Sequence, residues 1–266
     1  MQNDNHHRLR LQVLVLAGVL AGMTGCASMK GSTSRDPLEK VNRLSYQVTD
    51  KIDGYVLKPI AEVYKDHTPK PVRSGFTNFF NNITDLNTIV NDFFQGKVQQ
   101  GLADTSRVLL NTTLGLGGLV DVASPKLPRH VEDLGQTLGT YGAGEGAYLY
   151  IPLSGPSSFR DAPDLVTSTY TNPLFYLSNT ITFPIGLVWA VNNRANLLEA
   201  TRVRDEAALD PYTFTRAAYR EKRLFDIYDG NPPARGFEEF DDDETEPEPA
   251  TGARPAPTPA LAQHAK

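Results

Sequence analysis

Charged side chains are distributed very unevenly along this 266-residue chain, and the unevenness limits the surroundings in which the chain can fold. Residues 74–193 contain only 14 charged side chains in 120 positions, whereas the other 146 positions contain 43. None occurs in the 29 positions of residues 165–193. Because charged side chains are costly in hydrocarbon, this pattern favours partial immersion of residues 74–193 in a membrane.

The charge-free stretch is rich in aromatic residues but does not have the pattern of a spanning helix. It contains Phe175, Tyr176, Phe183 and Trp189, and Tyr and Trp suit the border between hydrocarbon and water. However, Thr, Asn, Ser and Pro residues interrupt it, among them Pro184, and a spanning helix needs roughly 20 consecutive apolar residues. We therefore expect this stretch to enter one leaflet without crossing the bilayer.

The strongest helical periodicity lies between Ser74, a suitable N-cap, and Gly96, a suitable C-terminal stop. Apolar residues recur there at steps of three and four on one face: Phe76, Phe79, Phe80, Ile83, Leu86, Val90, Phe93 and Phe94. The opposite face carries Asn78, Asn81, Asn82, Asp85, Asn91, Asp92 and Gln95. Such a helix either packs its apolar face on a protein core or lies in a membrane interface. The low charge of the surrounding region favours the interface.

The remaining segments predict a mainly α fold in a single domain. We expect helices over residues 36–53, which open with Asp36-Pro37, and over residues 97–112, 196–208 and 211–228. The last of these carries several basic residues and is expected to face water: Arg216, Arg220, Lys222 and Arg223. Strand-like alternation is confined to Tyr148–Leu153.

The N-terminus has the pattern of a bacterial lipoprotein signal. Basic residues precede an apolar run at Leu11–Ala21 that is too short to span a membrane. The following Met23-Thr24-Gly25-Cys26-Ala27-Ser28 resembles a lipoprotein cleavage box, in which the cysteine is lipidated and becomes the new N-terminus. We predict a signal peptide over 1–25 and a lipidated flexible tether over 26–35; the alternative is a free thiol in an ordinary signal peptide. Cys26 is the only cysteine, which excludes a disulfide within the chain.

The net charge of −5 comes from an acidic, proline-rich C-terminal tail. Without the first 25 residues and residues 238–266, 22 basic and 22 acidic side chains remain, so the body of the chain is neutral. A nucleic-acid binder needs a clustered excess of Lys and Arg, and this chain has none. We predict that residues 231–266 are disordered, because their composition cannot bury enough apolar area. An acidic docking tail for a basic partner is the alternative.

No constellation of residues points to catalysis or to a metal centre. His67, His130 and His264 lack the spacing of metal ligands, and no Gly-x-Ser-x-Gly nucleophile elbow is present. Two glycine clusters, at residues 115–118 and 142–146, lack the preceding strand or the lysine of a nucleotide-binding loop. We interpret them as hinges or tight bends between helices, since glycine tolerates positive φ.

An ordered series of motifs shows that the chain resembles the MlaA (VacJ) family of outer-membrane lipoproteins. The series begins with Asp36-Pro37-Leu38-Glu39, continues through Gly115–Ala123, Gly135–Gly139 and Tyr141–Gly146, and ends with Asp210-Pro211-Tyr212. It covers roughly residues 36–230. The acidic tail lies outside the family pattern.

This resemblance implies a mainly α, ring-shaped assembly of amphipathic helices in the inner leaflet of the outer membrane, bound to a trimeric porin. Phospholipids misplaced in the outer leaflet would pass through a partly hydrophilic central channel to a soluble periplasmic carrier, which maintains lipid asymmetry. No cofactor is implied beyond the covalent lipid on Cys26. Two alternatives remain: a passive porin-associated lipoprotein without transport activity, and a lipid hydrolase, for which no nucleophile and base are apparent.

Three groups of residues are candidates for function within that picture. The candidate membrane rim comprises Phe76, Phe79, Phe80, Phe93 and Phe94, whose helix would turn its asparagine face to the protein interior. The candidates for a flexible loop that controls the channel are Gly115, Gly117, Gly118, Gly142, Gly144 and Gly146. Arg107 and Arg160 could contact a lipid phosphate, but a structural ion pair with Asp104 or Asp161 is the favoured interpretation.

Overall fold

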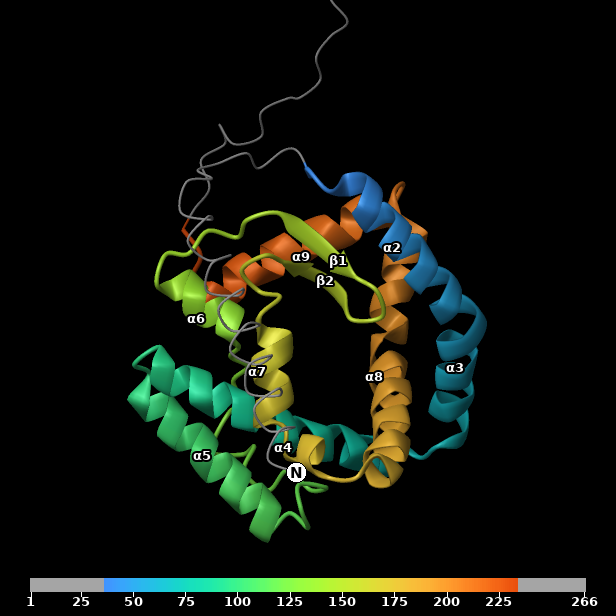
Figure 1. The fold of residues 1–266 in the computed structure, drawn as a ribbon. Helices are drawn as coiled ribbons and strands as arrows, with labels where there is room; N and C mark the ends of the chain where they lie inside the picture. Colours follow the sequence, from blue (N-terminus) through green and yellow to red (C-terminus); the bar gives the residue numbers. More distant parts are fainter. Residues whose placement is uncertain (1–35, 234–266) are drawn as a thin grey trace, which may run out of the picture. The chain divides into compact units, whose positions relative to one another are not determined.

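The computed structural model describes residues 36–233, and this part of the chain is mainly α-helical, as predicted (Figure 1). Its α-helices are α2 (Glu39–Ile52), α3 (Lys58–His67), α4 (Lys70–Phe94), α5 (Val98–Thr113), α6 (Leu134–Thr140), α7 (Asp164–Thr171), α8 (Asn179–Ala207) and α9 (Pro211–Ile227). Two shorter helical elements are the π-helix η2 (Asp53–Leu57) and the 3-10 helix η3 (Pro173–Tyr176). The predicted signal peptide, Cys26, the tether and all but the start of the predicted tail lie outside the described residues.

The first described helix begins later than predicted. The Asp36 carboxylate accepts hydrogen bonds from the Leu38 backbone N–H at 3.0 Å and from the Asn42 side chain, so Asp36 stands outside the helix and α2 begins at Glu39. At its other end α2 ends at Ile52, which confirms the predicted end near residue 53, and the chain continues through η2 into α3. Pro59 lies in the first turn of α3, where a missing N–H is tolerated.

Helix α4 begins at Lys70, so the predicted N-cap at Ser74 is wrong. Pro71 lies in the first turn, and its ring pre-sets the helical φ there. The predicted end is confirmed: Gly96 has a φ of +75° just beyond the helix, a conformation that favours glycine.

The charge-free stretch forms α7, η3 and the first half of α8. Helix α8 has 29 residues and begins at Asn179, so the predicted start at residue 196 is wrong. Pro184 is tolerated inside α8 because it lies near the N-terminus and removes a single backbone hydrogen bond. Among residues 36–233, no helix is both long enough and apolar enough to cross a membrane.

A short antiparallel hairpin is the only sheet in the described residues. Strand β1 (Tyr148–Ile151) lies within the predicted strand and pairs with β2 (Gly155–Ser158), with Tyr148 opposite Ser158. The second strand was not predicted, because Gly-Pro-Ser-Ser has neither apolar alternation nor β-branched residues. Leu153 and Gly155 both have positive φ, which closes the turn between the strands.

The helices pack in a closed circuit of contacts. Helix α4 packs along α5, and α3 packs along α8. Helix α8 also contacts α4 and α9, and α6 contacts both α4 and α9, so the chain of contacts α4–α6–α9–α8 returns to α4. The hairpin contacts α9 through β2 and α2 through β1 (Figure 1). All these helices belong to one compact unit.

Tyrosines connect the hairpin to α2 and α9. Tyr46, Tyr148 and Tyr212 form a buried cluster, with Tyr150 and Tyr219 packed against it. Their rings meet edge to face, with centroids from 5.2 Å to 6.1 Å apart. This arrangement is favourable for aromatic rings, and it holds the hairpin beside the two helices.

Candidate functional site

Helix α4 turns its polar face toward the rest of the protein. Its buried residues are Phe80, Asn82, Asp85, Asn87, Thr88, Asn91 and Asp92. Phe93 and Phe94, on the apolar face, are 42% and 61% exposed, and Phe76 and Phe79 are half-buried. Phe80 is the exception among the rim candidates: it is buried and packs edge-on against Phe79, so it does not belong to an outward-facing rim.

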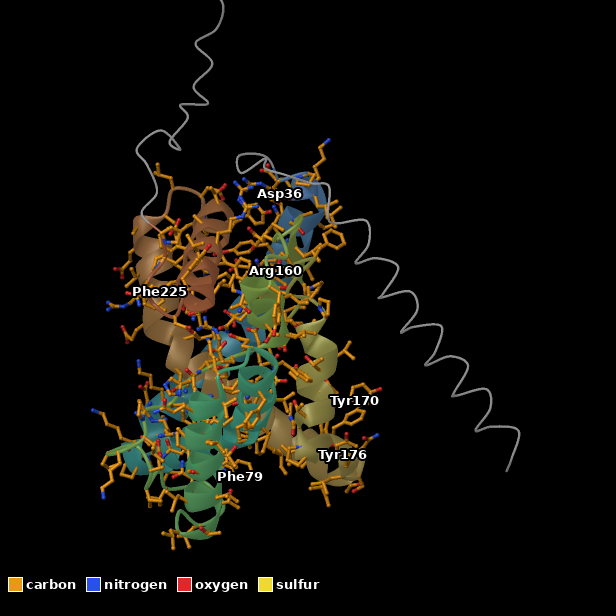
Figure 2. The ribbon with its side chains drawn as sticks, turned by 90° about the vertical axis from the view of Figure 1, so that its left-hand side faces the viewer. Asp36, Phe79, Arg160, Tyr170, Tyr176 and Phe225 are labelled. Atoms are coloured by element: carbon orange, nitrogen blue, oxygen red, sulfur yellow. The ribbon has the colours of Figure 1, made fainter. Side chains whose placement is uncertain are left out.

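The same inversion of polarity extends over the described region. Eighteen buried residues are polar or charged, whereas only eight are apolar. Large apolar side chains are exposed instead, among them Tyr170, Phe175 and Tyr176, whose rings pack edge to face. Tyr170 and Tyr176 lie on the same side of the molecule (Figure 2). Water-soluble domains bury their apolar residues and expose charged ones. This distribution therefore suits a protein whose outer surface meets an apolar medium.

Helix α9 turns three arginines inward, which corrects the prediction that its charges face water. Arg216, Arg220 and Arg223 are spaced by four and three residues, so they lie on one face of the helix. Their side chains are largely covered, and their acidic partners are, in order, Asp36, Glu145 and Asp133. Lys222, on another face, is exposed.

Helix α6, the hairpin, α7 and α9 come together (Figure 1), and residues in or next to all four line a small pocket. Its volume is about 170 Å³, and it is lined by Asp133, Ile151, Ser154, Gly155, Pro156, Ser157, Asp161, Asp164, Leu165, Tyr219 and Arg223. Sites for drug-sized ligands have volumes of roughly 300–1,000 Å³. This pocket therefore suits a small polar group, and we take it as the candidate functional site.

An arginine held between two carboxylates forms one wall of the pocket. The Arg223 guanidinium donates to both oxygens of Asp133, at 2.6 and 2.9 Å, and its Nε donates to Asp161 at 2.9 Å. The Tyr219 hydroxyl also donates to Asp161. Burial alone would lower the pKa of the Arg223 guanidinium. The hydrogen bonds and negative charges of Asp133 and Asp161 have a larger effect, so the pKa is raised. The wall is thus a set of fixed charges.

Asp164 lies at the start of α7 and uses one of its carboxylate oxygens to join three elements. Oδ1 accepts hydrogen bonds from the Asn87 side chain at 3.1 Å, from the Leu134 backbone N–H at 3.0 Å and from the Thr167 hydroxyl at 2.9 Å. Asp164 therefore ties α7 to α4 and to α6 beside the pocket.

The two candidate phosphate-binding arginines are both engaged in ion pairs. Arg160 donates from Nε to Asp161 at 2.7 Å, and both side chains are buried, so the favoured interpretation is confirmed for this residue. Arg107 is also buried, but its partner is Asp121, at 2.8 Å, and the predicted pairing with Asp104 is wrong. Asp104 instead bonds to a ring nitrogen of His130 on the segment between α5 and α6.

Two glycines of the first cluster, Gly115 and Gly118, are closely packed, and Gly118 lies against α4. A Cβ added to Gly115 would lie 2.1 Å from the Val120 carbonyl oxygen, and one added to Gly118 would lie 2.7 Å from the Asn82 side chain. The backbone N–H groups of Gly117 and Gly118 bond back to the end of α5. Gly115 and Gly118 are thus points of close packing, which fits the predicted tight bend rather than a hinge.

The second glycine cluster joins α6 to β1. Gly142 and Gly146 have positive φ, and a Cβ added to Gly142 or Gly144 would meet no neighbouring atom. Glu145 attaches the segment to Arg220 on α9. These glycines remain candidates for a movable loop.

A second group of buried acids lies between α4 and α5. Asp92 and Asp104 are fully buried, and Asp92 Oδ2 and Asp104 Oδ1 have no hydrogen-bond partner in the described part of the chain. Burial and the nearby charges of Asp104 and Glu132 raise the pKa of Asp92 to about 7. No set of three acidic, histidine or cysteine side chains within residues 36–233 is placed to hold a metal ion.

The sequence profile of the MlaA lipoprotein family matches residues 34–226. The chain belongs to the MlaA lipoprotein family. It is 34% identical to the intermembrane phospholipid transport system lipoprotein MlaA of Escherichia coli (strain K12) over 226 residues, 82% of this chain and 88% of the relative. The corresponding protein of Haemophilus influenzae (strain ATCC 51907 / DSM 11121 / KW20 / Rd) is 32% identical, over 78% of this chain and 87% of that protein.

A solved structure supports the same assignment. The structure described as "Structural basis for maintenance of bacterial outer membrane lipid asymmetry" is 33% identical in sequence and superimposes with a TM-score of 0.64. It covers 74% of this chain and the whole of its own.

The main residues of the pocket in this MlaA family member do not stand out in its sequence. Arg223 was assigned to a water-facing helix, and Asp133, Asp164 and Tyr219 were not singled out as site residues. The spacing of Arg216, Arg220 and Arg223 on one face of α9 was the available signal. A stripe of arginines at steps of four and three can pair with acids inside the fold as readily as it can face water.

Proposed function

We propose that this protein removes mislocalised phospholipids from the outer leaflet of the outer membrane and passes them through its polar interior to a soluble periplasmic carrier. Outer-membrane lipid asymmetry would thereby be maintained. The names of its relatives support this proposal: two of them are intermembrane phospholipid transport lipoproteins, and the similar structure concerns outer-membrane lipid asymmetry.

The inverted polarity of the described region is the observation that carries the proposal. A phospholipid headgroup crosses hydrocarbon only at high cost, because its polar and charged groups lose their hydration. A translocating protein therefore needs polar groups inside and apolar groups outside. The buried face of α4 and the exposed Phe93 and Phe94 have this arrangement.

The outward phenylalanines of α4 serve as the membrane rim in this proposal, and Cys26 carries the lipid that anchors the chain to the periplasmic side of the outer membrane. The charge-free residues 165–193, with Tyr170 and Tyr176 exposed, complete the immersed surface and are the proposed contact with a trimeric porin. The pocket beside Asp164 receives the lipid headgroup as it passes. Its volume of about 170 Å³ fits a headgroup better than a whole lipid.

Deletion of the gene tests the proposal directly. We expect more phospholipid on the cell surface, measured with a headgroup-reactive reagent that does not cross the membrane, and greater sensitivity to detergent. Both defects should be restored by the wild-type gene. If surface phospholipid and detergent resistance are unchanged, the transport function is wrong.

A passive porin-associated lipoprotein is the second candidate, because an apolar surface and a lipid anchor would serve it equally well. It predicts that deletion leaves surface phospholipid at the wild-type level. The buried polar face of α4 and the pocket favour transport, since a scaffold needs neither.

A further inference from the structure

The charges around the pocket do not cancel. Asp133 and Asp161 are each paired with an arginine, through Arg223 and Arg160. Asp164 also lines the pocket, yet within residues 36–233 no cationic side chain forms an ion pair with it. One carboxylate charge therefore remains uncompensated at the pocket.

The second oxygen of Asp164 is the source of this surplus. All three hydrogen bonds of the Asp164 side chain go to Oδ1, and none of the described residues donates to Oδ2. Asp164 is half-buried and lines the pocket, so its free oxygen is accessible to a ligand there. A ligand that brings a cation and several N–H donors to Oδ2 would form charge-assisted hydrogen bonds with it.

We propose that the pocket binds the primary ammonium group of aminophospholipids, such as phosphatidylethanolamine, through Asp164 Oδ2. This inference rests on the proposed function and adds a headgroup preference to it. A primary ammonium has three N–H donors, and the lining supplies further acceptors in the Ser154 and Ser157 hydroxyls.

An anionic headgroup is disfavoured at the same place. Arg223 already forms ion pairs with Asp133 and Asp161, so it does not offset the charge of Asp164. A glycerol phosphate headgroup would therefore meet a site with net negative charge. Repulsion between like charges disfavours an anionic ligand relative to a ligand of similar size that carries a cation. The pocket therefore favours ethanolamine over glycerol headgroups on the same acyl chains.

Photo-crosslinking of lipids to the full-length protein tests the preference. A photoreactive amino acid replaces Leu165, which lines the pocket and has no polar role there. The protein is reconstituted in vesicles with equal amounts of phosphatidylethanolamine and phosphatidylglycerol, and adducts are identified by mass spectrometry. We expect ethanolamine adducts to exceed glycerol adducts by roughly fivefold, as a charge-assisted hydrogen bond predicts.

The variant Asp164→Asn removes the negative charge of this side chain and keeps its hydrogen bonds to neighbouring elements. It keeps an oxygen that can accept the three bonds of Oδ1, so the fold is retained, and we expect the adduct ratio to fall close to one. The control Asp66→Asn removes an aspartate from the exposed surface of α3 and should leave the ratio unchanged. Unfolding midpoints of all proteins show whether each variant is folded.

The outcomes distinguish this inference from the proposed function. Absence of any lipid adduct at this position would overturn both. Adducts in equal amounts, or a preference for the glycerol headgroup in the wild type, would overturn the ammonium site alone. Loss of the adducts on adding millimolar free ethanolamine would show that the site takes soluble amines and would overturn its assignment to a lipid headgroup.

Discussion

At the scale of single residues, two aspartates show how the surroundings decide the sign of a contribution to stability. Asp92 faces other acids, and burial together with Asp104 and Glu132 raises its pKa to about 7. Burial alone would raise the pKa of Asp121. Hydrogen bonds from Arg107 and Asn111 stabilise the ionised carboxylate more strongly, so the pKa of Asp121 is lowered. The folded protein therefore favours the protonated form of Asp92 and the ionised form of Asp121.

The raised pKa of Asp92 predicts a defined dependence of stability on pH. Between the ordinary pKa of 3.8 and about 7, the folded state holds a proton that the unfolded state releases. The free energy of unfolding should therefore fall as pH rises through this window and level off above it. Asp92→Asn should remove this loss and stabilise the protein at pH 8 by roughly 1–3 kcal/mol, measured by denaturant unfolding in detergent.

The matched substitution Asp121→Asn should have the opposite sign. It removes the charge that Arg107 needs and is expected to lower the free energy of unfolding by roughly 1–3 kcal/mol at pH 8. Equal effects of the two substitutions would contradict the assigned environments.

At the scale of elements, the turn after α5 shows how a glycine-rich segment can be rigid. Gly115 is surrounded by the carbonyl oxygens of Val120 and Asn111, whereas Gly117 has open space at its Cβ position. The pattern of glycines is similar in a hinge and in a tightly packed bend. Only the neighbours distinguish them.

Alanine substitutions within this one turn test that distinction. Gly115→Ala should lower the free energy of unfolding by roughly 2–4 kcal/mol, because the backbone would have to move away from the added Cβ. Gly117→Ala, the control, has only the cost of a positive φ, about 1–2 kcal/mol. Thermal unfolding in detergent measures both, and a smaller effect at Gly115 than at Gly117 would refute the close packing.

At the scale of the whole described region, polarity is inverted relative to a water-soluble domain. Exposed apolar side chains cover the charge-poor region, and the C-terminal half of α8 and α9 carry exposed charged residues such as Arg202 and Lys222. An apolar surface of this kind favours the membrane interface without a spanning helix.

The variant Phe94→Asp tests whether this surface contacts lipid. In a Cys26→Ala background, which removes the proposed anchor, we expect the substitution to weaken partition into vesicles by roughly tenfold, measured by flotation. Because Phe94 is 61% exposed, the fold should be almost unaffected. Val203→Asp changes a similarly exposed residue among charged neighbours on α8 and should leave partition unchanged. Equal loss in both variants would count against a membrane rim on α4.

Local patterns in the sequence were sufficient to determine the helical class and several boundaries of this protein. The steps of three and four in α4, the stop at Gly96 and the cap at Asp210 depend on neighbours within a few residues. The Gly-Pro-Ser-Ser strand departed from local expectation, because pairing with β1 outweighs intrinsic propensity.

The tertiary structure alone decided which side of each helix is inside and which charges meet. The direction of α4 and α9 follows from partners distant in the sequence, since Asp133, Asp161 and Arg223 come together only when α6, the hairpin and α9 pack. Periodicity defines two faces of a helix, but it does not state whether lipid or protein covers each. The pocket at Asp164 depends on that choice, and so sequence patterns could not reveal it.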